Sequence, residues 1–344
     1  MPVSLVNFVQ KSARLHPDLP AVTCEGRTRT WKEVWQRVQS LAGGLQSLGL
    51  QRGERIAYLG FNTDWFFECY FAPSLTGLEL VALNYRLALP ELVDCLNDCS
   101  PAALICDADH ARIAQEAVES CPSIKHLIAI GGEDGSIDAV SYEALLAEDH
   151  TPEGAATSGD DTLIIYYTGG TTGRAKGVML SHWNLFSNSM GTIPNYGLKP
   201  LENYLLAGPM FHSAAGSRVY TTAILATHMI LLPKFDVPAF LGLIEEHKVR
   251  ATQCVPTMMQ MILDHDAFGN FDISSLKMIT WGAAPTPDDL LRRIIKTFPD
   301  AELFHGYGMT EASPLVTALG PEFHNSDAEA HGKLGSAGKP LSHV

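Results

Sequence analysis

The sequence predicts an α/β fold with two β-sheets, each covered by helices on both faces. Short apolar segments recur along the chain, and amphipathic helical segments separate them almost throughout. The 344 residues also exceed the usual size of one domain, so at least two packed units are expected.

The first half of the chain alternates regularly from residue 30 onward. A helix is expected over 30–48, where Thr30 and Glu33 have the spacing of a capping box and Gly49 can end the helix in a left-handed turn. The elements expected next are a strand over 55–60, a buried helix over 63–75, a strand over 79–83, a helix from Pro90, a strand over 102–107, a helix over 110–119 and a strand over 126–130.

A polar, glycine-bearing segment over 148–161 predicts a boundary, so the expected domains are 1–160 and 161–330. After it, strands are expected over 162–167, 203–208, 228–233, 251–255, 277–282 and 302–308. Helices are expected from about 181, over 213–226, from Asp236 and Pro238, and over 257–265 and 287–297. Because parallel sheets bind ligands at the carboxyl ends of their strands, the glycine-rich loops after strands are the candidate sites.

Composition and charge exclude several classes of protein. No run of about 18 or more apolar residues is present and the first residues lack a signal-peptide core, so we expect a cytoplasmic chain without a transmembrane segment. The formal net charge of -14 argues against a nucleic-acid partner or an anionic membrane surface. The seven cysteines form no C-x-x-C pair and are expected to be reduced and buried.

The loop TGGTTGRAKG, residues 168–177, is the strongest site signal in the chain. It follows a predicted buried strand, and its glycines allow backbone N–H groups to approach an anion closely. Thr168, Thr171 and Thr172 add hydroxyl donors, and Lys176 adds a positive charge suited to phosphate. The sequence therefore predicts a phosphate-binding loop.

Two familiar phosphate-binding patterns do not fit this loop. A Walker-type loop needs glycine, lysine and a hydroxyl residue in succession, but Arg174 and Ala175 separate Gly173 from Lys176 and Gly177 follows the lysine. No G-x-G-x-x-G is present, so a dinucleotide-binding fold also lacks support.

The segment YTGGTTGRAKGV, residues 167–178, resembles the phosphate loop of the adenylate-forming enzymes, which include acyl-CoA and aryl-CoA synthetases, luciferases and peptide-synthetase adenylation domains. Gly169 and Ala175 depart from the serine and proline usual there. Further segments resemble the family's motifs in the family's order: GPMFHSAAG over 208–216, WGAAP over 281–285, HGYGMTE over 305–311 and GSAGKP over 335–340. The resemblance implies the fold of an acyl-CoA synthetase N-terminal domain.

The resemblance also implies a role for each matching residue. Lys176, Thr310, Glu311 and His212 are the implied catalytic residues, with Glu311 holding Mg²⁺ and Tyr307 stacking on adenine. The implied nucleotide-binding residues are Thr168, Gly169, Gly170, Thr171, Thr172, Gly173, Gly282, Ala283, Ala284, Pro285, His305, Gly306, Tyr307 and Gly308, and the implied acyl tunnel is lined by Phe211, His212, Gly216 and Trp281.

These roles suit the chemistry of acid activation with ATP, Mg²⁺ and CoA. A carboxylate that attacks the α-phosphate of ATP builds negative charge on phosphorus while pyrophosphate leaves. Hydroxyls, a lysine and a magnesium-binding carboxylate would stabilise that charge.

The implied substrate is an uncharged carboxylic acid. His212 stands where the amino-acid-activating branch of the family usually has an aspartate, so an amino acid is not expected. The small residues 213–217 leave room for a chain or a ring. A fatty acid is the first expectation, and an aryl acid such as a cinnamate-like one is the alternative.

The resemblance implies more chain than is present. Family members continue after Pro340 through a β-rich subdomain with a ribose-binding aspartate, a hinge and a small domain with a catalytic lysine. We expect residues 331–344 to begin the truncated third subdomain and the chain alone to lack full activity. A non-catalytic nucleotide- or acyl-binding fragment is the alternative, and a homodimer is left open.

Overall fold

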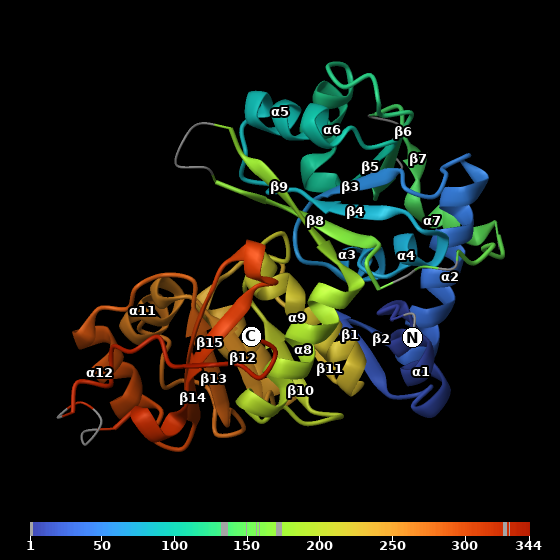
Figure 1. The fold of residues 1–344 in the computed structure, drawn as a ribbon. Helices are drawn as coiled ribbons and strands as arrows, with labels where there is room; N and C mark the ends of the chain where they lie inside the picture. The colour runs from blue at the N-terminus through green and yellow to red at the C-terminus, as the bar shows by residue number, and fades with distance from the viewer. Residues whose placement is uncertain are drawn as a thin grey trace. The chain divides into compact units, whose positions relative to one another are not determined.

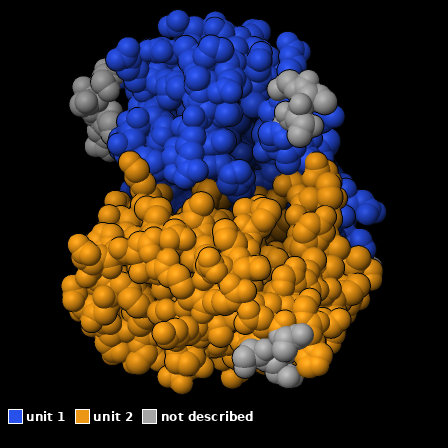
Figure 2. Space-filling model, turned by 90° about the vertical axis from the view of Figure 1, so that its left-hand side faces the viewer, with its two compact units in different colours: residues 1–20, 29–186, 210–212 blue, residues 21–28, 187–209, 213–344 orange. Residues whose placement is uncertain are grey.

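A computed structural model describes residues 3–131, 137–148, 150–155, 157, 159–169, 174–325, 329 and 331–344. The chain forms two compact units, coloured separately in Figure 2. The first comprises Met1–Pro20, Arg29–Phe186 and Met210–His212, and the second comprises Ala21–Thr28, Ser187–Pro209 and Ser213–Val344.

The first unit contains a seven-stranded sheet in the order β7-β6-β5-β3-β4-β8-β9. Its strands are β3 (Arg55–Leu59), β4 (Glu79–Ala82), β5 (Ala103–Asp107), β6 (His126–Ile130), β7 (Val140–Ser141), β8 (Thr162–Thr168) and β9 (Lys176–Ser181). Neighbouring strands are parallel except for β8 and β9, which form an antiparallel pair.

Helices cover both faces of this sheet (Figure 1). They are α1 (Val6–Leu15), α2 (Trp31–Ser47), α3 (Asp64–Cys69), α4 (Ala72–Thr76), α5 (Leu89–Cys99), the 3₁₀ turn η1 (Ala108–His110), α6 (Ala111–Val118) and α7 (Tyr142–Ala147). On one face, α5 and α6 bury Leu92 and Ala114 against the strand residues Leu59, Val81 and Leu104. These apolar strands are buried on both faces, as parallel strands between helices usually are.

The second unit contains a nine-stranded sheet in the order β16-β15-β14-β13-β12-β10-β11-β1-β2. Its strands are β1 (Pro20–Cys24), β2 (Arg27–Thr30), β10 (Asn203–Leu206), β11 (His228–Leu231), β12 (Ala251–Cys254), β13 (Met278–Gly282), β14 (Glu302–Gly308), β15 (Leu315–Leu319) and β16 (Lys339–Pro340). The pairs β1–β11, β11–β10, β10–β12, β12–β13 and β13–β14 are parallel, whereas β15 is antiparallel to both β14 and β16.

The helical elements of this unit are the end of α8 (His182–Tyr196), α9 (Ser213–Leu225), α10 (Val237–His247), α11 (Pro256–Asp264), α12 (Asp288–Thr297) and the 3₁₀ turns η2 (Thr310–Ala312) and η3 (Pro321–Phe323). Figure 1 shows α8 and α9 lying together over the sheet. Leu241, Met259 and Ile294, from α10, α11 and α12, pack with the strand residues Ile279 and Leu303 in the main core of the unit.

Most of the expected elements are confirmed. At the start of α2, the Thr30 amide donates to Glu33 Oε2 at 2.7 Å and the Glu33 amide donates to Thr30 Oγ1 at 3.2 Å, which completes the predicted capping box. All seven cysteines are buried and free. Within the described ranges, no helix has the length and apolarity needed to cross a membrane.

One expectation is wrong. The single helix over 63–75 is two short helices, α3 and α4, because Pro73 has no N–H to donate to the carbonyl of Cys69. The structure also has a strand that the sequence did not predict, β9, which lies before α8 and pairs antiparallel with β8.

The strands β8 and β9 follow residue 160 in the sequence but complete the sheet of the first unit. Sequence reasoning gave no account of α1, β1, β2, β7, α7 or β15. The sequence domains 1–160, 161–330 and 331–344 remain a proposal.

Candidate functional site

The described ends of the predicted phosphate loop lie where β8 ends and β9 begins. Thr168 and Lys176 are paired across the two strands, and Thr168 Oγ1 donates to the carbonyl oxygen of Lys176 at 3.5 Å. Lys176 and Gly169 are exposed, and apart from its chain neighbours no atom of a described residue lies within 4 Å of the position that a Cβ on Gly169 would take. Gly170, Thr171, Thr172 and Gly173 lie outside the described residues.

The predicted adenine segments meet at the carboxyl ends of β13 and β14. Gly282 and Gly306 are paired in the two parallel strands, and a Cβ on Gly282 would fall on the carbonyl oxygen of Gly306. A Cβ on Gly306 would lie 2.5 Å from the hydroxyl oxygen of Tyr196. Both positions therefore require glycine, because backbone and a buried tyrosine occupy the space of a side chain.

Beyond this close contact the two segments present an exposed surface. Ala283, Ala284 and Pro285 are exposed, and Ala283 has a left-handed backbone with φ 66°. Tyr307 is 53% exposed. Strained backbone of this kind often occurs at binding sites, and an exposed aromatic face suits a planar base.

Thr310 and Glu311 follow β14 in the short turn η2. Thr310 Oγ1 and the hydroxyl of Ser213, the first residue of α9, lie 2.8 Å apart. Glu311 is exposed. In the part of the chain that the structure describes, no group of three or more potential ligands among His, Cys, Asp and Glu surrounds a metal position. A single exposed carboxylate still fits Mg²⁺, which usually takes one or two protein carboxylates and completes its shell with water and phosphate oxygens.

The predicted tunnel residues Phe211 and His212 belong to the first unit. Phe211 is buried and packs edge-on against Tyr85, with 5.2 Å between ring centroids. The His212 side chain reaches the surface, yet neighbouring protein atoms exclude part of its water. This desolvation, helped by the nearby charge of Arg86, lowers the pKa of His212 below its usual value. The imidazole is therefore neutral at pH 7.

The other two predicted tunnel residues belong to the second unit. Trp281 is 2% exposed and stacks on His305, with 5.9 Å between ring centroids. Gly216 is buried in α9. Burial lowers the pKa of His305, whose Nδ1 lies 3.3 Å from the carbonyl oxygen of Ser336. Packing within the unit accounts for these positions, and their contact with a substrate stays a prediction.

The structure thus gathers the predicted residues in two groups. The second unit brings the segments 282–285 and 305–308 together at one sheet edge, with Thr310 beside the start of α9. The first unit holds Thr168, Gly169, Lys176, Phe211 and His212.

Sequence reasoning missed two arginines. Arg86 is exposed, and its guanidinium lies 5.4 Å from the ring centre of Tyr85 and 5.9 Å from that of Phe211. Arg218 is buried inside α9. A charged residue within the otherwise uncharged segment 213–226 was the signal that could have drawn attention to Arg218.

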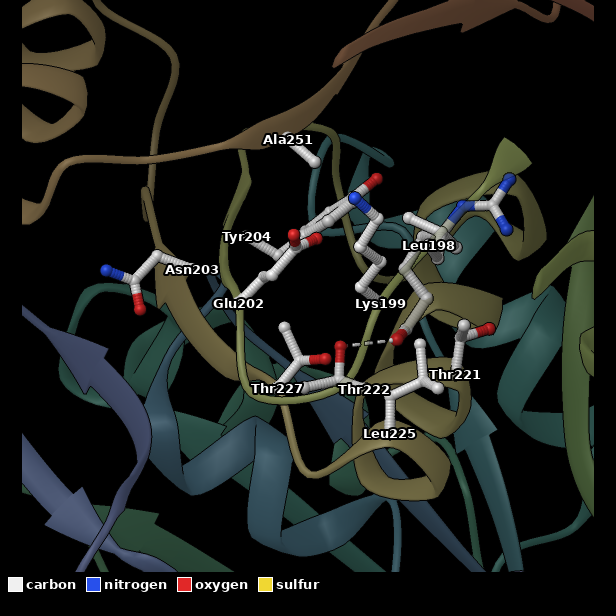
Figure 3. Close-up of a pocket in the computed structure, with 11 residues that line it drawn as sticks. Leu198, Lys199, Glu202, Asn203, Tyr204, Thr221, Thr222, Leu225, Thr227 and Ala251 are labelled. Carbon is white, nitrogen blue, oxygen red and sulfur yellow. Dashed lines mark hydrogen bonds between the residues drawn. The ribbon is translucent and has the colours of Figure 1, made fainter. Parts of the chain in front are cut away.

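A small cavity lies at the other end of the second sheet (Figure 3). Its volume is about 10 Å³, room for about one water molecule. Asn203 and Ala251, the first residues of β10 and β12, contribute to its lining, and Thr222 Oγ1 donates to the Arg218 carbonyl at 2.8 Å beside it. The cavity therefore lies at the amino ends of these strands, away from the edge that carries the motifs.

Comparison with known proteins places these features in a family. The model of the AMP-binding enzyme family matches residues 9–344. The chain is 36% identical over 331 residues to a feruloyl-CoA synthase of an Amycolatopsis species, covering 96% of this chain and 63% of that protein. It is 29% identical over 344 residues to an indoleacetate–CoA ligase of Aromatoleum aromaticum, covering 99% and 65%. It thus spans less than two thirds of the length of these relatives.

Comparison with solved structures leads to the same family. The N-terminal domain of FACL13 from Mycobacterium tuberculosis matches with a TM-score of 0.86 and 26% identity, covering 99% of this chain and 83% of that one. The o-succinylbenzoate CoA synthetase of Bacillus subtilis, solved with its acyl-adenylate intermediate, matches with a TM-score of 0.84 and 27% identity, covering 99% and 64%. The chain belongs to the AMP-binding enzymes, and its fold is that of the N-terminal domain of the acyl-CoA synthetases within the adenylate-forming superfamily.

Proposed function

We propose that the protein activates a carboxylic acid with ATP and transfers the acyl group to CoA. The observation that carries the proposal is the edge of the second sheet, where two glycine-ended strands, an exposed tyrosine and the Thr310–Glu311 turn lie together. This is the carboxyl edge of parallel strands, where α/β folds bind nucleotides.

The β13–β14 edge is proposed to bind the adenosine part of ATP. Gly282 and Gly306 are in backbone contact and carry no side chains at the ends of β13 and β14. A flat base could therefore lie against the exposed residues 283–285. The exposed ring of Tyr307 supplies an aromatic face for stacking.

Each unit offers a residue suited to phosphate, Lys176 in the first unit and Thr310 in the second. A carboxylate oxygen of the acid attacks the α-phosphorus, and the bond to the oxygen that bridges to the β-phosphate breaks, so pyrophosphate leaves with the electron pair. Lys176 would neutralise charge on the departing phosphates, and the Thr310 hydroxyl would donate to an α-phosphate oxygen. Ser213, hydrogen-bonded to Thr310, would hold that hydroxyl in place.

Glu311 would hold the Mg²⁺ that accompanies ATP. The ion supplies positive charge to the phosphate oxygens as their negative charge grows. The exposed carboxylate of Glu311 is suited to this role because it is a hard oxygen donor that leaves most of the coordination shell to water and phosphate.

The second half of the proposed reaction forms the thioester. The thiolate of CoA attacks the carbonyl carbon of the acyl-adenylate, and AMP leaves with the electron pair of the broken carbon–oxygen bond. The His212 side chain is neutral or positively charged, so it offers no anion to pair with the ammonium of an amino acid.

Between the two acid classes expected from the sequence, we propose an aryl acid before a fatty acid. The support is that two similar proteins of higher sequence identity are named for feruloyl-CoA and indoleacetate, whereas those named for fatty acids are 26% identical. The test is thioester formation by the protein as encoded, with ATP, Mg²⁺, CoA and a panel of aryl, fatty and amino acids. Acyl-CoA formed only with amino acids, or with none of the panel, would contradict the proposal.

A further inference from the structure

The short segment Met210–His212 is tied to the first unit by hydrogen bonds to one of its residues. The chain on either side of this segment belongs to the second unit. The Met210 amide donates to Oδ1 of Asn62 at 2.8 Å, and the Tyr70 hydroxyl donates to the carbonyl oxygen of Met210. Only 2% of Asn62 and none of Tyr70 is exposed, so water does not compete for these bonds.

The sheet of the first unit fixes the two side chains that hold Met210. Asn62 follows the carboxyl end of β3, and the residue before it donates its amide to Oδ2 of Asp107, the last residue of β5, at 2.7 Å. Tyr70 directly follows α3, and its hydroxyl lies 3.1 Å from that of Tyr166 in β8. The Tyr70 hydroxyl therefore joins the segment to the strand that leads into the predicted phosphate loop.

The residues that follow Met210 are the ones implied to contact the acid. Phe211 packs edge-on against Tyr85, and its ring centre lies 4.6 Å from that of His212. Such ring contacts leave a side chain free to slide, whereas hydrogen bonds fix the direction of the backbone. The two bonds of Met210 therefore set the position from which both side chains extend.

We propose that Asn62 and Tyr70 position the acid by holding the backbone of Met210. The held peptide keeps Phe211 and His212 where the acid binds, so Asn62 and Tyr70 act through these residues and do not touch the acid. Loss of either hydrogen bond should impair use of the acid. It should leave nucleotide binding unchanged, because the residues proposed to bind adenosine belong to the second unit. This inference rests on the proposed function.

The test compares acid use with nucleotide binding in variants of the protein as encoded. Acid-dependent exchange of pyrophosphate into ATP gives kcat/KM for each acid of the panel, and calorimetric titration gives Kd for AMP. Tyr70→Phe and Asn62→Ala should each lower kcat/KM for the best acid by about ten- to a hundredfold, because misplaced binding groups lose the orientation on which the reaction depends. Kd for AMP should stay within about twofold.

Tyr58→Phe is the matched control for Tyr70→Phe. It removes the hydroxyl of another fully buried tyrosine of the first unit, which lies 3.0 Å from Thr63 Oγ1. It should lower the urea midpoint about as much as Tyr70→Phe and leave kcat/KM for the acid unchanged. Tyr70→Phe also covers the case that Asn62→Ala does not fold, because it removes a single oxygen atom and keeps the ring.

The outcomes separate this inference from the proposed function. If Tyr70→Phe impairs acid use no more than Tyr58→Phe does, or if it weakens AMP binding as much as acid use, the positioning role is overturned and acid activation stands. No exchange with any acid by the unchanged protein overturns both.

Discussion

The β8–β9 hairpin in the first unit and the β13–β14 edge in the second unit both carry residues proposed to serve ATP, and they are built differently. At the hairpin end, the space around Gly169 is open and Lys176 is exposed. At the edge, Gly282 and Gly306 are in backbone contact, and the core residue Trp281 directly precedes Gly282.

The difference follows from what each region is proposed to bind. A planar base needs a surface of fixed shape, and tightly packed backbone at the β13–β14 edge supplies such a surface. Phosphates are bound through charge and N–H groups, which need little packing beneath them. Substitutions at the hairpin should therefore affect function alone, whereas substitutions at the edge should affect function and stability together.

The largest expected effect contrasts two glycines. Gly282→Ala should lower the free energy of unfolding by about 2–3 kcal/mol, because the new methyl falls on the Gly306 carbonyl and must push the strands apart. Gly169→Ala should change it by less than about 0.5 kcal/mol, because its side chain meets nothing within 4 Å. Urea unfolding measures both, and equal stabilities for the two variants would contradict the comparison.

Charge removal at either region should affect nucleotide use without unfolding the protein. Lys176→Ala and Glu311→Ala should each weaken use of Mg·ATP by about ten- to a hundredfold, since each loses a charged interaction with phosphate or metal. Both side chains are exposed, so urea unfolding should be unchanged. Lys296→Ala and Glu119→Ala remove exposed charges elsewhere and serve as controls. Unchanged KM for ATP in both site variants would remove the support for these roles.

Low pH should destabilise the fold, because three buried histidines stay neutral in the folded protein. Burial lowers the pKa of His182, of His228 and of His324 to about 4 each, against 6.5 in the unfolded chain. The unfolded state then takes up protons first as the pH falls, so stability is lost from pH 6.5 down to about 4. At pH 5 each residue should cost about 2 kcal/mol.

His324→Phe isolates one of these contributions in the second unit. Among the described residues neither ring nitrogen of His324 makes a hydrogen bond of good geometry, so phenylalanine removes the titrating group at little cost in hydrogen bonding. The loss of unfolding free energy between pH 7 and pH 5 should shrink by about 2 kcal/mol in the variant. An identical pH dependence in both proteins would show that His324 is not held neutral.

The smallest expected effect concerns the exposed ring at the edge. Tyr307→Ala should weaken binding of AMP by about tenfold through loss of stacking, and Tyr307→Phe should stay within about twofold. Calorimetric titration measures both. Equal weakening by the two substitutions would indicate that the hydroxyl matters and the ring does not.

Local patterns predicted most of the fold, and long-range pairing accounts for the rest. The capping box at Thr30 and the apolar period of α2 are contained in neighbouring residues, so the helix was predictable. The strand β9 was not, because its residues alternate poorly and its place depends on pairing with β8. Pro73 divided a helix that apolar content alone favoured.

In the candidate site, too, local patterns were predictable and long-range contacts were not. The glycines at 282 and 306 could be predicted as special positions, but the clash that explains them requires two strands that are distant in the sequence.

Exchange of labelled pyrophosphate into ATP, measured without CoA, tests the central claim most directly. If the protein holds ATP for attack by a carboxylate, the protein as encoded will exchange label only when Mg²⁺ and an accepted acid are present, and Glu311→Ala will reduce the rate by about ten- to a hundredfold. Exchange that proceeds without any acid, or conversion of ATP to ADP and phosphate in place of AMP and pyrophosphate, would contradict the account.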